Sequence, residues 1–143
     1  SSVPVDGSAN ANAGASSAVA PVVTTTSESA DPVANLAKVI YFDYDSFVVK
    51  PEFTPTIEGY AKALSTAKTK RMLIEGHTDN RGGREYNLAL GQKRAEATVK
   101  SLTLLGVSAE QLEAVSFGKE RPAAEGDSEE AHAKNRRAEF KSR

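Results

Sequence analysis

The chain has 143 residues, 39% of them hydrophobic, and a net charge of −1 at pH 7. This length suits one domain with spare residues, no apolar run reaches the ~18 residues that span a membrane, and the charge argues against general nucleic-acid binding. The absence of cysteine excludes disulfides, thiolate metal sites and cysteine nucleophiles.

The N-terminal stretch predicts a flexible tether over residues 1–35. It is mostly Ala, Ser, Thr, Val, Asn, Gly and Pro, without an aromatic residue, and buries too little surface to offset its ordering entropy. A typical end-to-end span is roughly 30 Å. A cloning or processing remnant is the alternative, because a start at Ser1-Ser2, without Met or a signal peptide, indicates a processed or truncated chain.

A domain is predicted over residues 36–143. KVIYFDYD, residues 38–45, is rich in β-branched and aromatic residues and predicts a strand that ends at acidic residues. Residues 51–66 begin with proline and continue with apolar residues at helical spacing, which predicts an amphipathic helix. KRMLIEG, residues 70–76, predicts a second strand, and we interpret its glycine as the end of that strand.

The second half of the domain adds a long helix and two strands. After the loop HTDNRGG, a helix is predicted over residues 85–105, closed by Gly106. Its apolar stripe consists of Leu88, Gly91, Ala95, Val99, Leu102 and Leu105. Residues 112–117 predict a strand, 120–130 a polar loop and 137–141 a short final strand. The order β-α-β-α-β-β indicates an α/β (α+β) two-layer sandwich, a mixed sheet with helices packed on one face.

One cluster of ionisable residues raises the question of a metal site. Glu75, His77 and Asp79 alternate, so on a strand they would share a face, and such side chains bind zinc or iron. However, no HExxH motif is present, and the only other histidine, His132, lies far along the chain. We therefore predict no metal ligand.

Acid–base catalysis is a second possibility. Asp43, Asp45 and Asp79 could supply carboxylates for it. No G-x-S-x-G motif accompanies them, and single carboxylates at strand ends are usually turn or cap residues. We predict no catalytic residue.

A binding site is the third possibility. Asp79 and the aspartates after the first strand follow strand ends that can converge on one rim, where ligands bind in α/β proteins. At about 100° per residue, Asn87, Leu90 and Arg94 form a helical stripe roughly 90° from the apolar face, so Arg94 would lie at a half-buried edge. A carboxylate and a guanidinium held apart suit a zwitterionic ligand. The alternative is that Asp79 and Arg94 pair with each other.

Five motifs occur in a specific order along the domain. They are F-D-x-D-S (42–46), E-G-H-T-D-x-R-G (75–82), Y-N-x-x-L-G-x-x-R-A (86–95), S-F-G-x-E-R-P (116–122) and N-R-R (135–137). Together they resemble the OmpA-like peptidoglycan-binding domains, over about residues 38–140, and within that family the peptidoglycan-associated lipoproteins.

The resemblance implies an OmpA C-terminal-like fold and non-enzymatic, non-covalent binding of the meso-diaminopimelate of the peptidoglycan stem, without a cofactor. It makes Asp79 the ligand of the ammonium and Arg94 the ligand of the carboxylate. The other pocket residues that it implies are Phe42, Asp43, Tyr44, Thr78, Asn87 and Leu90. Under this interpretation His77 becomes a packing residue.

The resemblance also implies a place and partners. A lipid anchor, absent from this chain, would hold the protein on the periplasmic face of the outer membrane, and the periplasmic propeller TolB would compete with peptidoglycan for residues 78–85. Asn80 and Gly83 depart from the usual Glu and Thr of the lipoproteins. Another envelope protein, of OmpA or flagellar-stator type, and a cell-wall hydrolase stay as alternatives.

The N-R-R motif, residues 135–137, permits two interpretations. In the first, its side chains fix the last strand through buried ion pairs. In the second, they form a basic rim near the glycan. We favour the first.

Overall fold

The computed structural model describes residues 31–143. Residues 35–143 form one compact unit. The tether predicted over residues 1–35 therefore lies outside the described residues, apart from its last five. Within residues 31–143, no helix combines the length and the apolar character that a membrane crossing requires.

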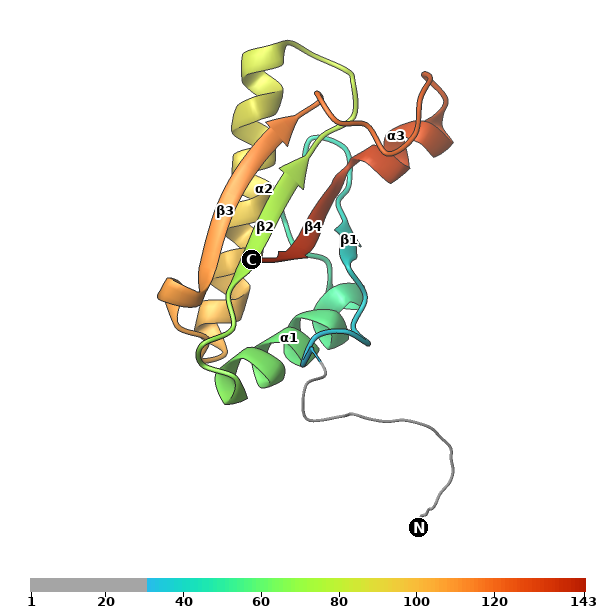
Figure 1. Cartoon of the computed structure of the whole chain (residues 1–143). Coiled ribbons are helices and arrows are strands. Elements are labelled where there is room, and N and C mark those ends of the chain that lie inside the picture. Colours follow the sequence, from blue (N-terminus) through green and yellow to red (C-terminus); the bar gives the residue numbers. More distant parts are fainter. Residues whose placement is uncertain (1–30) are drawn as a thin grey trace, which may run out of the picture. The chain divides into compact units, whose positions relative to one another are not determined.

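Four strands form one mixed sheet in the order β1-β4-β2-β3 (Figure 1). β2 and β3 are parallel, whereas β4 is antiparallel to both β1 and β2. β1 and β2 therefore run in the same direction, and their C-termini lie at the same end of the sheet. The bounds are β1 Val39–Tyr41, β2 Met72–His77, β3 Leu112–Gly118 and β4 Arg137–Ser142.

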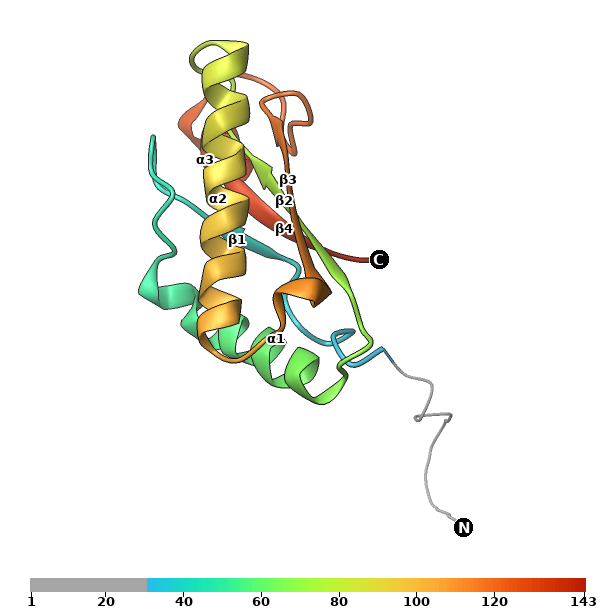
Figure 2. The same cartoon turned by 90° about the vertical axis from the view of Figure 1, so that its left-hand side faces the viewer.

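The two longer helices lie on one side of this sheet (Figure 2), which confirms the predicted two-layer arrangement. Two short 3₁₀ turns and a third helix complete the domain. The bounds are η3 Pro51–Phe53, α1 Thr54–Thr66, α2 Arg84–Leu104, η4 Ala109–Gln111 and α3 Glu129–Asn135.

The core lies between the helices and the sheet. The Tyr60 ring of α1 stacks on the Phe140 ring of β4, with centroids 4.1 Å apart, and the Tyr60 hydroxyl donates to the Ala37 carbonyl at 2.8 Å. Ile40, Ile74 and the other core side chains around this pair are fully buried. Burying an aliphatic side chain of this size contributes about 1.5–3 kcal/mol.

Two element predictions had the wrong bounds. The strand predicted over residues 38–45 is only three residues long, because the chain leaves the sheet after Phe42 and Asp45 adopts a φ of 55°. The loop predicted over residues 120–130 is confirmed up to Ser128, and α3, which the sequence did not indicate, begins at Glu129. α3 has seven residues with a mostly polar sequence, and Ser128 caps it by accepting from the Ala131 N–H at 3.1 Å.

Gly76 does not end its strand, as we expected from the sequence, because β2 continues to His77. It is needed where α2 crosses β2. A Cβ atom built on Gly76 would lie 1.7 Å from the carbonyl oxygen of Gly91, so the two backbones touch at this point. The long helix thereby gains a fixed position over the end of β2.

The buried face of α2 is also rotated from the predicted stripe. Gly91, Ala95 and Leu102 are buried as expected, but Leu105, just after the helix, is 49% exposed. The buried face instead extends to four residues that the sequence placed at its edge or did not place, namely Asn87, Leu90, Arg94 and Thr98. Arg94 is therefore fully buried, at 0% exposure, and not half-buried.

Candidate ligand-binding site

A hollow of about 170 Å³ opens at the edge where β1 and β2 end, and we call it the rim hollow. Six residues expected in a pocket from the sequence line it, namely Tyr44, Thr78, Asp79, Asn87, Leu90 and Arg94. Four further residues complete the lining, namely Asp45, Arg81, Gly82 and Tyr86. The rim hollow thus combines the β1 end, the β2–α2 loop and the first turns of α2.

Asp79 is buried beside the rim hollow and is held by two arginines. Its Oδ2 accepts from Arg81 Nη2 at 2.7 Å and lies 3.6 Å from Arg136 Nη1, and its Oδ1 accepts from the Arg81 backbone N–H at 3.1 Å. Burial raises the pKa of the Asp79 carboxyl, but the Arg81 hydrogen bonds outweigh burial, so this pKa lies below its usual 3.8. Asp79 is therefore a carboxylate at neutral pH.

Arg94 does not form an ion pair with Asp79. Its guanidinium instead donates to three backbone carbonyls, those of Ser46 at 2.8 Å, His77 at 2.9 Å and Asp43 at 3.1 Å. Burial lowers the pKa of Arg94 to about 10, with the charge of Asp79 opposing this shift, so the side chain stays protonated at neutral pH. Arg94 thus ties the chain after β1 to the end of β2.

The remaining predicted pocket residues lie beside the rim hollow. Phe42 is buried under the Arg94 guanidinium, 5.3 Å from ring centroid to Cζ. Phe42 and Asp43 line a neighbouring hollow of about 240 Å³, and Asp43 pairs with Lys50 at 3.1 Å. These two residues do not reach the rim hollow itself.

Sequence reasoning missed Arg81 and Tyr86 as lining residues. For Arg81 a local signal exists, because an aspartate that accepts from the backbone N–H two residues on shapes an Asx-turn. For Tyr86 there is none, since its hydroxyl donates to Asp45, 41 residues away in sequence. Only the folded chain brings that pair together.

The β2–α2 loop is fixed by polar contacts on both sides. The Asn87 amide donates to the Arg81 carbonyl at 2.8 Å, and the Lys119 ammonium donates to the Gly82 carbonyl at 2.8 Å. Gly82 has a φ of 93°, which favours glycine. The loop is therefore ordered before a ligand binds, so binding costs little additional conformational entropy.

The carboxylates considered for acid–base catalysis do not gather. Asp43 pairs with Lys50, Asp45 accepts from Tyr86, and Asp79 pairs with Arg81. Each thus has a partner of its own, although Asp45 and Asp79 both line the rim hollow.

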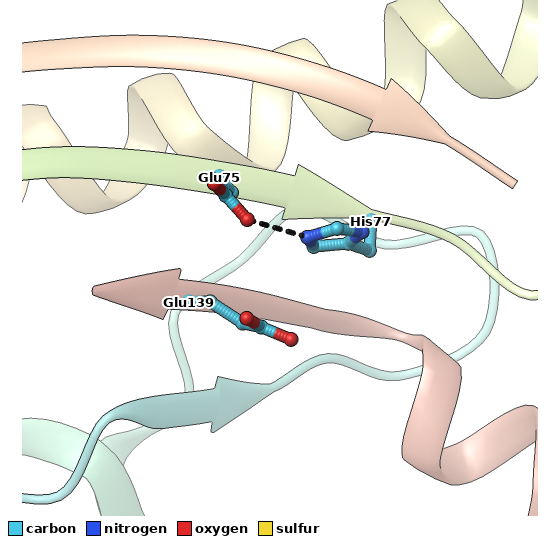
Figure 3. A group of neighbouring side chains, drawn as sticks. All are labelled: Glu75, His77 and Glu139. Carbon is cyan, nitrogen blue, oxygen red and sulfur yellow. Dashed lines mark hydrogen bonds and ion pairs between the residues drawn. The ribbon is translucent and has the colours of Figure 1, made fainter. Parts of the chain in front are cut away.

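His77, from the motif E-G-H-T-D-x-R-G, lies on the face of the sheet that the two long helices do not cover (Figure 3). The atoms of Glu75, His77 and Glu139 that could bind a metal ion lie within 4.8 Å of one another. We call these three residues the outer-face cluster (Figure 3). It differs from the set considered from the sequence, because Glu139 and not Asp79 is the third member. Glu139 is already paired with Arg137 and with Lys141 at 3.3 Å, so a metal ion would have to displace two cations.

His77 itself is a packing residue. Its ring stacks on Phe117 with centroids 5.6 Å apart, and its Nε2 lies 3.3 Å from Glu75 Oε1. Burial lowers the pKa of His77 to about 4, and the positive charge of Arg137 adds to this effect. The imidazole is therefore neutral at pH 7.

The N-R-R motif serves structure, as we favoured from the sequence. Asn135 Oδ1 accepts from the Ala123 and Ala124 backbone N–H groups at 2.6 and 3.0 Å. Arg136 donates to the Phe42 carbonyl at 2.9 Å and pairs with Glu129 at 3.0 Å. Asn135, Arg136 and Arg137 are all buried, and so they do not form an exposed basic rim.

The fold and the rim hollow define a class of protein. A model of the OmpA family matches residues 41–136, and the chain therefore belongs to the OmpA family. Among curated relatives, the peptidoglycan-associated lipoprotein of Pseudomonas aeruginosa is 52% identical over 71% of this chain. The chain spans 60% of the length of that relative.

Solved structures give the same family. The peptidoglycan-associated lipoprotein from Burkholderia pseudomallei is 44% identical, with a TM-score of 0.76, over 79% of this chain and 100% of that chain. The C-terminal domain of Helicobacter pylori MotB is 27% identical, with a TM-score of 0.67, over 75% of this chain and 84% of that chain. The arrangement of strands and helices is thus shared with proteins of the cell envelope.

Proposed function

We propose that residues 36–143 bind peptidoglycan non-covalently through the meso-diaminopimelate of its stem peptide. The observation that carries this proposal is the lining of the rim hollow, where the carboxylate of Asp79 and the guanidinium of Arg94 face one space without pairing. The curated relatives support it, because their name records an association with peptidoglycan.

The chemistry of the ligand fits these two charges. The free end of diaminopimelate carries an ammonium and a carboxylate on one carbon. Asp79 would accept from the ammonium, and Arg94 would donate to the carboxylate, since its Nη1 and Nη2 each carry a second N–H group beyond those given to carbonyls. The volume of about 170 Å³ is below the ~300 Å³ of drug-sized sites, so it suits a head group only.

The cellular part of the proposal is a link between two layers of the envelope. Residues 1–35 would act as a tether to a lipid anchor in the outer membrane, with the binding domain on the periplasmic side. The name lipoprotein of the relatives supports the anchor. The likeness to MotB keeps a wall-binding role in another envelope assembly as the alternative, at lower identity.

A binding titration with a soluble diaminopimelate muropeptide tests the site. Asp79→Asn keeps the shape of the side chain and removes its charge, and we expect it to weaken binding about tenfold or more. Glu58→Gln is the control, because Glu58 is an exposed acid of α1 and lies outside the rim hollow. Equal affinity of wild type and a folded Asp79→Asn variant would remove the site assignment.

A non-enzymatic role is tested with the same ligand. We expect muropeptides incubated with the protein to keep their masses, because the two carboxylates that line the rim hollow are each engaged by another side chain, Asp45 by Tyr86 and Asp79 by Arg81. Appearance of cleaved products would favour the hydrolase alternative instead.

The competition between TolB and peptidoglycan for residues 78–85 is part of the proposal. Those residues include the loop that lines the rim hollow. We expect saturating TolB to weaken muropeptide binding. Unchanged muropeptide affinity with TolB bound would show that the two partners use separate surfaces.

A further inference from the structure

Arg81 occupies the position that a ligand ammonium needs. Its Nη2 donates to Asp79 Oδ2 at 2.7 Å, and its guanidinium covers the Tyr44 ring, with Cζ 4.2 Å from the centroid. The Asp79 side chain is only 6% exposed, whereas that of Arg81 is 38% exposed. A cation from solution can therefore reach this oxygen only after Arg81 leaves it.

The second arginine on the same oxygen is held in place. Arg136 Nη1 lies 3.6 Å from Asp79 Oδ2, but its other nitrogens are fixed by the Phe42 carbonyl and by Glu129. Arg81 has only a distant further acid, Glu129 at 4.0 Å. Of these two partners of Asp79, Arg81 is the one that a ligand can replace.

The charges around the rim hollow set a condition on that exchange. Three guanidiniums, those of Arg81, Arg94 and Arg136, surround the single carboxylate of Asp79. Asp45 also lines the rim hollow and accepts from Tyr86. A bare ammonium that takes the Arg81 position adds positive charge and leaves Arg81 without its acid. A head group with both an ammonium and a carboxylate adds no net charge and gives Arg81 a new acceptor.

We propose that Arg81 is a specificity-determining residue. In the free protein it occupies the Asp79 carboxylate, and only a zwitterionic head group displaces it from there. The ligand ammonium then replaces Arg81 on Asp79, and the ligand carboxylate receives the released guanidinium. This inference rests on the proposed function. It predicts selection of diaminopimelate over lysine at the third position of the stem, since a lysine head carries the ammonium alone.

The test compares two soluble muropeptides that differ only at this position, one with meso-diaminopimelate and one with L-lysine. Arg81→Ala and Arg81→Met remove the charge, and Met keeps an unbranched stem against Tyr44. Arg84→Ala is the control, because Arg84 is an exposed arginine of the same region that pairs with Glu120 outside the rim hollow. Circular dichroism checks the fold of each variant.

We expect both Arg81 variants to bind the lysine muropeptide more tightly than wild type. The ratio of the two dissociation constants should fall by about two- to fivefold, the effect of one partly exposed charge contact. Arg84→Ala should keep the wild-type ratio. A ratio that is unchanged in the Arg81 variants, or affinities that fall equally for both ligands, would overturn the role of Arg81.

Failure of this inference differs from failure of the proposed function. If wild type binds the diaminopimelate muropeptide and Asp79→Asn does not, while the ratio is unchanged in the Arg81 variants, only the role of Arg81 is wrong. If wild type binds neither muropeptide, the proposed function is wrong and the role of Arg81 falls with it.

Discussion

The outer-face cluster and the rim hollow both contain charged residues near the end of β2, but they differ in how their charges are compensated. In the outer-face cluster, Glu75 and Glu139 come from paired positions of β2 and β4, and Arg137 and Lys141 neutralise Glu139. In the rim hollow, Asp79 and Arg94 come from a loop and a helix, and they share a space without an ion pair between them.

The difference teaches that a dense group of ionisable residues is not by itself a site. The outer-face cluster has the histidine and the acids, yet its contacts close within the sheet and stabilise it. The rim hollow has fewer acids, but a buried carboxylate and a buried guanidinium face an open space, and one partner, Arg81, is exposed and replaceable. The binding region is marked by a charge whose partner is exposed and replaceable, next to an open space.

Both regions depend on the close contact of β2 with α2. Gly76→Ala should lower the free energy of unfolding by about 3 kcal/mol or more, because the added methyl group meets the backbone of Gly91 and not a movable side chain. Urea denaturation measures this. Gly83→Ala is the control, since no atom lies within 4 Å of its Cβ position. Similar midpoints for the two variants would contradict the tight contact.

Arg94 is expected to matter for stability as well as for binding. Arg94→Ala removes the donor from the three carbonyls at the ends of β1 and β2, and we expect a loss of about 3 kcal/mol of unfolding free energy. Thermal and urea unfolding of this variant and of Lys93→Ala, an exposed neighbour, give the measurement. A loss no larger than that of Lys93→Ala would mean that Arg94 has no structural role.

The outer-face cluster should show itself in the pH dependence of stability. The pKa of His77 falls from its usual 6.5 to about 4 on folding. Between these two pH values the unfolded chain binds a proton at His77 and the folded protein does not. Stability then decreases as the pH falls, by about 2 kcal/mol between pH 7 and pH 5. His77→Gln should lack this part of the decrease, as urea unfolding at the two pH values would measure. An equal loss of stability in wild type and His77→Gln would show that a group other than His77 takes up the proton.

The smallest effect separates the two regions most simply. Glu139→Gln removes an acid of the outer-face cluster and should lower the unfolding free energy by about 1 kcal/mol, because the pair with Lys141 is partly exposed and the Gln oxygen can still accept from the buried Arg137. Muropeptide affinity should stay within about twofold of wild type, since no contact joins Glu139 to the rim hollow. A large loss of affinity in titration calorimetry would assign ligand binding to the outer face instead.

The sequence predicted the sheet and the two long helices, since local patterns determine them, and it predicted six of the residues that line the rim hollow. Strand-end position and helical spacing indicated Asp79 and Arg94, whereas Tyr44 and Thr78 were implied only by the family resemblance. It did not predict α3, whose short polar sequence depends on its cap and on packing, or the true reason for Gly76. The partners of Asp79 and Arg94 were also out of reach, because contacts such as Arg94 to Ser46 join residues 48 apart in sequence.

The most direct test of the account is an NMR titration of the ¹⁵N-labelled protein with the diaminopimelate muropeptide. The account predicts that the largest shifts occur in the amides of residues 78–87 and around Tyr44, whereas β4 residues of the outer face, such as Glu139 and Lys141, change little. Shifts that concentrate on the outer face while the amides of residues 78–87 stay unperturbed would contradict the assignment of the binding site.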